Sequence, residues 1–330
     1  MSHKYDLLTV GNAIIDILVT VEEEFLVEQK LDKSAMKLVD ADESKALYSK
    51  VGEATERSGG SAANTAVGYG YFGGKASYIG TIAKDQFGTI FNHDMDASGV
   101  DYTPIYVEGK PTSQSIILVT PDGERTMNTY LGASTDLGPE HIDKELILSA
   151  KTVYFEGYLW YQPPAKAAFD HIAKLTKGTD TKISVSLADQ FCVDNFRDSF
   201  KGLIDDGTIE ILFANEDEIK ALYQVDTFEE AMAENAKTGV LSFITRGANG
   251  AVAQQGDVTE YASVDPVFDI VDLTGAGDIF AAGALYGLEH GMSLADSTQL
   301  GCVAAREVIQ HMGPHPKVDI ISVAKKAGLL

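Results

Sequence analysis

The chain has 330 residues, 45% of them hydrophobic, which is enough to bury a large core in one large domain or two medium ones. Its 26 Lys and Arg residues are outnumbered by 49 Asp and Glu residues, giving a formal net charge of −23. This balance argues against the basic face that nucleic-acid or acidic-membrane binding needs, and any phosphate site must therefore be built locally.

The amino-terminal segment predicts a first strand and not a signal peptide, because Asn12 and Asp16 interrupt its apolar run and no cleavage-type segment follows. No apolar run reaches the roughly 18 residues of a membrane span, so we expect no membrane partner. The two cysteines are too few for a disulfide framework and have no zinc-type spacing. These features predict a cytoplasmic protein.

Apolar runs of strand length alternate with longer segments of helical period along the chain. Strands are predicted at Leu7–Val10, Ala76–Ile79, Thr152–Phe155, Ile183–Leu187, Ile209–Phe213 and Val240–Thr245. Helices are predicted at Ser61–Tyr71, Gln86–Ala97, Ala165–Leu175, Asn195–Ile204 and Glu216–Tyr223. Nearly continuous apolar strands separated by helices indicate an α/β fold with a mainly parallel sheet covered on both faces.

The region from Asp101 to Tyr130 breaks this alternation with two or three strands and no helix between them. Thr112–Thr120 and Glu124–Tyr130 are joined by Pro121-Asp122-Gly123, a hairpin turn signal. We expect a small β lid of residues 17–40 and 101–133 beside a large domain of residues 1–16, 41–100 and 134–330. The alternative is an extension at the edge of the main sheet.

A double glycine opens a predicted helix of small residues. In Gly59–Ala66 (GGSAANTA), Gly59 and Gly60 permit close approach of a ligand, while Ser61 and Asn64 offer a hydroxyl and an amide suited to a polyol. The alternative is tight helix–sheet packing. Asp16, a carboxylate after the first strand, suits vicinal hydroxyls, or a turn or cap role. Gly68–Gly73 matches GxGxxG but falls at a helix end, so it does not predict a dinucleotide site.

The motif DLTGAGD follows an apolar run that predicts a strand at Phe268–Val271, and it leads into an Ala-rich helix. Its glycines and the free N–H groups of the helix form an anion site suited to a transferring phosphoryl group. Asp278 in the first helical turn predicts a general base next to that site. The alternative is that Asp278 caps the helix.

Weaker candidates surround these motifs. Asn215 to Glu218 (NEDE) follows a strand and offers metal-binding oxygens, or forms an ordinary acidic helix start. Arg125 in the predicted hairpin is one of few cations placed to reach a phosphate. His311 and His315 flank Gly313-Pro314, and we expect both at the surface.

Together these motifs resemble the two signature regions of the ribokinase-like (PfkB-type) carbohydrate kinases: GGSAANTA, GTIAKDQFG and DLTGAGD occur in the right order and spacing. NEDE resembles the NxxE motif of that family, and Thr245–Gly250 its TxGxxG loop. The resemblance implies a three-layer α/β/α sandwich with a small β lid. It also implies ATP as cosubstrate, contacted by Asn215, Thr245, Gly247 and Gly250.

The resemblance also assigns roles to the site residues. Asp278 would be the catalytic base, and Gly275, Ala276 and Gly277 the anion hole. Asn215 and Glu218 would organise Mg²⁺ and its waters. Asp272 and Thr274 lie where the family's site for a monovalent cation such as K⁺ would be.

Several stretches are most similar to the adenosine-kinase branch of the family. GNAIIDI places Asn12 and Asp16 at the ribose-binding positions of that branch. Separately, Arg125 occupies the position of its catalytic lid arginine. Ala63, in place of Gln, and Leu159, in place of a base-stacking Phe, depart from the branch, with Tyr158 or Trp160 as substitutes. The resemblance therefore implies phosphorylation of the 5′-hydroxyl of adenosine or a related purine nucleoside. A fructokinase- or ribokinase-type sugar kinase is the alternative, and a non-catalytic ligand-binding protein a remote one; monomer and homodimer both stay open.

Overall fold

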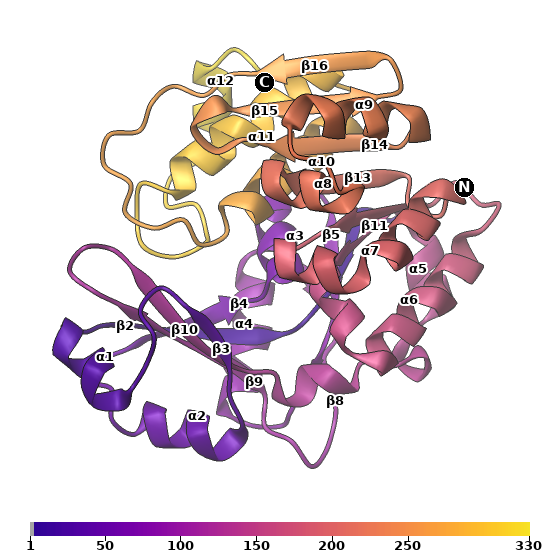
Figure 1. The fold of residues 1–330 in the computed structure, drawn as a ribbon. Helices are drawn as coiled ribbons and strands as arrows, with labels where there is room; N and C mark the ends of the chain where they lie inside the picture. The colour runs from indigo at the N-terminus through magenta and orange to yellow at the C-terminus, as the bar shows by residue number, and fades with distance from the viewer. Residues whose placement is uncertain (1–2) are drawn as a thin grey trace.

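A nine-stranded sheet organises the larger part of the molecule in the computed structural model, which describes residues 3–330 (Figure 1). Its strand order is β16-β15-β14-β13-β12-β11-β1-β5-β7. The strands from β14 to β7 pair in parallel, and β15 and β16 add an antiparallel edge. The strands are β1 (Tyr5–Val10), β5 (Ala76–Ile79), β7 (Asp101–Tyr102), β11 (Ala150–Glu156), β12 (Lys182–Ser186), β13 (Ile211–Asn215), β14 (Leu241–Thr245), β15 (Ala251–Gln255) and β16 (Val258–Ala262).

Helices cover both faces of this sheet, because its strands carry apolar side chains on both sides (Figure 1). On β1, Leu7 packs into one core cluster and its neighbour Leu8 into the other. The first face is covered by α3 (Ser61–Tyr71), α4 (Gln86–Ala97), α10 (Ala276–Glu289) and α11 (Leu294–Val308). The second is covered by α5 (Lys144–Leu148), α6 (Pro163–Thr176), α7 (Gln190–Asp205), α8 (Glu216–Tyr223) and α9 (Phe228–Thr238). The predicted three-layer α/β/α sandwich is confirmed.

A separate five-stranded sheet, ordered β3-β10-β9-β2-β4, forms the lid (Figure 1). Its strands are β2 (Ile14–Thr20), β3 (Met36–Leu38), β4 (Thr55–Gly59), β9 (Ser113–Val119) and β10 (Arg125–Tyr130). Alternate side chains on one face, such as Ile15 and Ile116, are buried with residues of α1 (Glu23–Gln29) and α2 (Ala41–Tyr48). The opposite face of this sheet lines a cavity.

Some elements differ from the sequence-based expectation. The lid sheet already begins at Ile14 and includes β4, placed by prediction in the large domain, while β7 belongs to the large sheet. The polar β4 sequence gives no strand signal of its own, and its pairing with β2 makes it a strand. The predicted strand Phe268–Val271 is wrong: the segment has no ladder partner, and Phe268 is 93% exposed.

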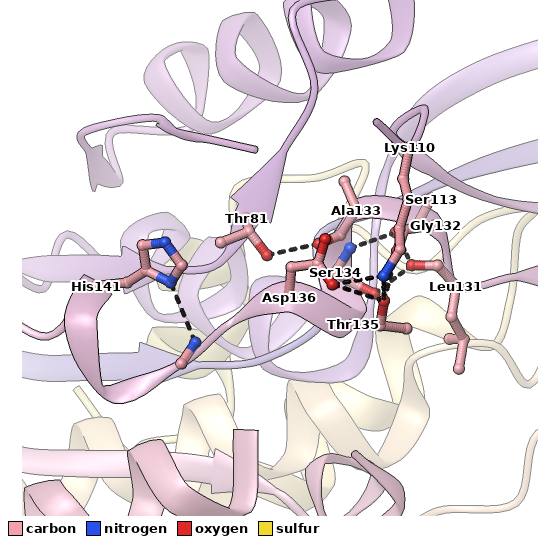
Figure 2. A network of polar contacts seen from close by, with 11 residues as sticks. Thr81, Lys110, Ser113, Leu131, Gly132, Ala133, Ser134, Thr135, Asp136 and His141 are labelled. Carbon is pink, nitrogen blue, oxygen red and sulfur yellow. Dashed lines mark hydrogen bonds and ion pairs between the residues drawn. The ribbon is translucent and has the colours of Figure 1, made fainter. Parts of the chain in front are cut away.

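One polar network, at the start of β9 and the end of β10, joins the lid to the short strand β6 (Thr81–Ile82) of a separate two-stranded sheet (Figure 2). After β10, the chain turns through η1 (Gly132–Asp136), and Ser113 donates from its hydroxyl to the carbonyl of Leu131 at 2.5 Å. Thr81, in β6, donates to the carbonyl of Ala133 at 2.9 Å. Strand β6 pairs with β8 (Ile105–Tyr106) and α12 (Ile320–Lys326) ends the fold. Within residues 3–330, no helix is both long and apolar enough to cross a membrane.

Candidate active site

A cavity of about 470 Å³ lies between the inner face of the lid and the carboxyl ends of the large-sheet strands. The lid contributes Ile14, Asp16, Ser115, Ile117, Met127 and Thr129. The large domain contributes, among others, Gly60, Ser61, Asn64, Tyr158, Ser186, Asn215, Glu218, Thr245 and residues 274–278. Both small-residue motifs of the sequence therefore meet at one cavity, where an open parallel sheet usually binds ligands.

Asp278 lies where these two motifs touch. Its carboxylate accepts hydrogen bonds from the Ser61 hydroxyl at 2.6 Å and from the Asn64 amide at 3.0 Å. Enclosure by protein raises the pKa of Asp278, and these two hydrogen bonds oppose that shift. The N-cap of α10 is Gly275, and Asp278 lies in the first turn of the helix, where its carboxylate hydrogen-bonds to Ser61 and Asn64 of α3.

The turn before Asp278 requires glycine at one position. Gly275 has a φ of 73°, and a Cβ atom there would lie 2.5 Å from Cβ of Pro314. Gly275, Ala276 and Gly277 all line the cavity at the first turn of α10. The first N–H groups of an α-helix have no partner within the helix, so this turn presents donors and a positive dipole end to the cavity. It suits an anion.

Asp16 enters the cavity from β2 of the lid. Burial, together with the charges of Asp278 and Asp272, raises its pKa to about 7. A side chain at Gly59 would collide with the Asp16 carboxylate, which explains that glycine. Gly59 therefore makes room for the predicted acceptor-binding carboxylate and does not itself line the cavity.

Asn12 lies beneath the cavity and does not line it. Its amide donates to the buried carboxylate of Glu156 at 2.5 Å and accepts from Gln162 at 3.1 Å. Glu156 also accepts from the backbone N–H of Ala62, at the start of α3, at 2.8 Å. Burial raises the pKa of Glu156 to about 7. We did not single out Glu156 from the sequence, although it follows a predicted strand as Asp16 does.

Arg125 joins the lid to the anion-site turn. Its guanidinium lies 2.9 Å from the Asp272 carboxylate, and the two side chains are 20% and 1% exposed. Asp272 also accepts from the backbone N–H and hydroxyl of Thr274 and from the N–H of Gly313, at 2.7 to 2.8 Å. Thr274 lines the cavity, whereas Arg125 and Asp272 flank it. The side-chain oxygens of Asp272 and Thr274, predicted as ligands of a monovalent cation, thus already have partners within the protein.

Asn215 is the N-cap of α8, and Glu218 lies in the first turn of that helix. The Asn215 side chain accepts from the N–H of Glu218 at 2.9 Å, and the Glu218 carboxylate accepts from the Asn215 amide at 2.5 Å. Both line the cavity with Thr245, while Gly247 and Gly250 lie outside its lining. Across residues 3–330, no group of three or more His, Cys, Asp or Glu side chains could hold a metal. A Mg²⁺ bound beside Asn215 and Glu218 would have to take its other oxygen ligands from groups outside these two side chains.

Residues 29–320 match the model of the pfkB family carbohydrate kinases. The chain belongs to that family. A probable sugar kinase from Rhizobium etli CFN 42 is 46% identical, with a TM-score of 0.93 over 99% of this chain and 100% of that one. The adenosine kinase from Sinorhizobium meliloti is 43% identical, with a TM-score of 0.91 over 98% and 99%. The adenosine kinase of Saccharomyces cerevisiae is 29% identical over 97% of this chain and 99% of its own length.

These matches make the protein an ATP-dependent pfkB-family kinase that acts on a hydroxyl, and they confirm the adenosine-kinase-like branch. The departures from that branch can now be placed. Tyr158 lines the cavity, whereas Trp160 packs in the core against Phe169 and Phe200, with ring centroids 4.8 and 4.7 Å away. Of the two aromatic residues expected to substitute for the missing Phe, Tyr158 is therefore the one that lines the cavity.

Both histidines expected at the surface make internal contacts. His311 lies 3.0 Å from the Glu307 carboxylate. His315 Nε2 lies 3.2 Å from Oδ1 of Asn64, and burial lowers the pKa of His315 to about 4. The prediction failed because Asn64 is 251 positions away in the chain, and no local pattern reports such a contact.

Proposed function

We propose that this pfkB-family kinase transfers the γ-phosphate of ATP to the 5′-hydroxyl of adenosine or a related purine nucleoside. The observation that carries the proposal is the position of Asp278. Its carboxylate is held by Ser61 and Asn64 beside the glycine turn of an anion site, in the same cavity as Asp16 of the lid.

In the proposed reaction, Asp278 accepts the proton of the acceptor hydroxyl as its oxygen attacks the γ-phosphorus and the bond to ADP breaks. The N–H groups of residues 275–277 stabilise the charge on the transferred group. Asp16 binds the ribose hydroxyls and places the primary hydroxyl toward Asp278. Mg²⁺, near Asn215 and Glu218, would supply further neutralisation of the phosphates.

Arg125 has a proposed role in the transition state. In this structure its partner is Asp272, whose backbone leads directly into the anion-site turn. To contact the transferring phosphate, the Arg125 guanidinium would leave the Asp272 carboxylate and pair with a phosphate oxygen. The proposal therefore treats the Arg125–Asp272 pair as the resting position of a lid cation.

The charges and apolar surface of the cavity support a neutral acceptor with a base. Among its lining residues in the described part of the chain there is no Lys or Arg, while Asp16 and Asp278 both face inward. A phosphorylated or acidic sugar would add negative charge beside these carboxylates, and Arg125, which flanks the cavity, is already paired with Asp272. Ile14, Ile117 and Met127 on the lid, with Tyr158 opposite, offer apolar contact that suits a purine and exceeds what a free sugar can use.

A neutral sugar is the second candidate acceptor, favoured by the 46% identity to the probable sugar kinase from Rhizobium etli CFN 42. An ADP-release assay with adenosine, inosine, ribose, fructose and an acidic keto-sugar separates the candidates. We expect adenosine to have the highest kcat/KM and the acidic sugar the lowest. A higher kcat/KM for ribose or fructose would contradict the nucleoside proposal, and no turnover with any acceptor would favour a non-catalytic ligand-binding protein.

A further inference from the structure

We infer that His315 is a positioning residue, which fixes the side-chain amide of Asn64 and through it the carboxylate of Asp278. This inference rests on the proposed role of Asp278 as the base. It does not depend on which acceptor is phosphorylated, because His315 contacts Asn64 and Asn64 contacts Asp278 within the protein itself.

The direction of each hydrogen bond follows from the chemistry of the groups. A carboxylate only accepts, so the Asn64 atom 3.0 Å from Asp278 Oδ2 must be the NH₂ group. The Asn64 carbonyl oxygen then faces Nε2 of His315 at 3.2 Å, and Nε2 must carry a hydrogen. The chain of donors therefore runs from His315 to Asn64 to Asp278.

The surroundings of His315 keep it neutral. Arg57 and Asp94 are the charged groups that face it; the charge of Arg57 lowers its pKa and that of Asp94 raises it, and burial is the largest effect. The neutral ring has a single N–H, and the contact with Asn64 selects the Nε2 tautomer. A neutral imidazole cannot serve as a phosphate-binding cation, so its contribution is orientation.

The loop that carries His315 is tied to the site at a second point. The N–H of Gly313 donates to Asp272 at 2.8 Å, and Gly313 has a φ of 94° with the Arg57 guanidinium against it. The loop after α11 is thus anchored both to the anion-site turn and, through His315, to α3. It is well placed to hold Asn64 still.

Orientation of Asn64 matters because a terminal amide can turn over. Without the His315 N–H, the amide could present its oxygen to Asp278, which would repel the carboxylate and remove one of its two donors. Loss of a donor to the carboxylate raises the pKa of Asp278. The base would then be protonated over more of the acidic range, and turnover would fall there first.

His315→Phe and His315→Gln test this, with His311→Gln on the same loop as the control. In His315→Phe we expect kcat to fall about tenfold with little change in either KM, and the acid limb of the kcat profile to move to higher pH. Gln can donate from a similar position, so His315→Gln should recover most of the activity. His311→Gln should match the parent enzyme.

Two results would overturn the inference. One is an unchanged kcat and pH profile in His315→Phe; the other is equal loss in the Phe and Gln variants with an unmoved acid limb, which would mark a merely structural role. If His315→Phe does not fold, or no acceptor is turned over, ¹⁵N NMR of the parent enzyme decides: we expect a neutral Nε2–H tautomer at neutral pH. An Nδ1–H tautomer or an imidazolium would contradict the inference.

Discussion

At the residue scale, the site contains several buried carboxyl groups, and their pKa values are higher than those of exposed carboxyl groups. Asp16, Glu156 and Glu218 each have a pKa raised to about 7, with burial as the largest cause. A folded pKa above the unfolded one contributes stability at low pH, and that contribution is lost as pH rises toward the folded pKa. The burial of these three carboxyl groups around the proposed acceptor site therefore lowers the free energy of unfolding at neutral pH.

Asp16→Asn tests this cost. The amide does not titrate, so the variant should gain about 3 kcal/mol of unfolding free energy over the parent as pH rises from about 4 to about 7. The same change should raise the KM for the acceptor about tenfold and leave that for ATP nearly unchanged, since Asp16 lies on the acceptor side. Urea unfolding at several pH values and steady-state kinetics measure the two effects. Equal stability differences at all pH values, or no difference from an exposed Glu53→Gln control, would refute the electrostatic explanation.

At the element scale, the lid is held to the large domain by the Arg125–Asp272 ion pair and by the polar contacts of η1, the turn that follows β10. Arg125→Ala leaves the Asp272 side chain, 1% exposed, without this cation. We expect turnover to fall at least about tenfold and acceptor binding to weaken less. The reason is that the proposed role of the Arg125 charge is to stabilise the transferring phosphate in the transition state. Lys33→Ala, at a lid cation paired with Glu23 and Asp122, is the control. An unchanged turnover number in Arg125→Ala would remove this arginine from catalysis.

Gly132, the first residue of η1, lies where the backbone and its surroundings require a glycine. Gly132 has a φ of 38°, and a Cβ atom there would collide with the carbonyl oxygen of Pro111. Gly132→Ala should lower stability by about 2 kcal/mol and speed amide hydrogen exchange in β9 and β10. Gly109→Ala is a matched control, since Gly109 has a φ of 84° with open space around it. If both variants lose the same stability, backbone conformation alone explains the glycine and the collision does not.

The elements also show how far sequence reasoning reaches. The regular apolar periods predicted α3 and α4 with their observed bounds, and most large-sheet strands within two residues, because burial on a helix or sheet repeats along the chain. Strand β4 and the exposed segment around Phe268 were mispredicted, because strand formation depends on a neighbouring strand. β4 pairs with β2, whereas the Phe268 segment has no partner strand. The motifs located Asp278 and the glycine turn, while Glu156 and His315 entered the site through contacts distant in sequence.

At the scale of the whole molecule, the net charge of −23 makes self-repulsion a general term in stability. Salt screens this repulsion, so the melting temperature should rise by a few degrees between about 0.02 and 0.3 M NaCl. The rise should shrink as the pH approaches the pI of about 4.5. Differential scanning calorimetry at two pH values measures both trends. A melting temperature that falls with added salt at neutral pH would show that favourable ion pairs outweigh the repulsion.

The central claim is that Asp278 is the base for phosphoryl transfer in the cavity under the lid. The most direct test is Asp278→Asn, which keeps the shape and a hydrogen-bonding oxygen beside Ser61 but cannot accept the proton. We predict that turnover falls by about two to four orders of magnitude, while calorimetric binding of ATP and of the best acceptor stays within about threefold of the parent. Turnover within about tenfold of the parent, with binding intact, would contradict the account.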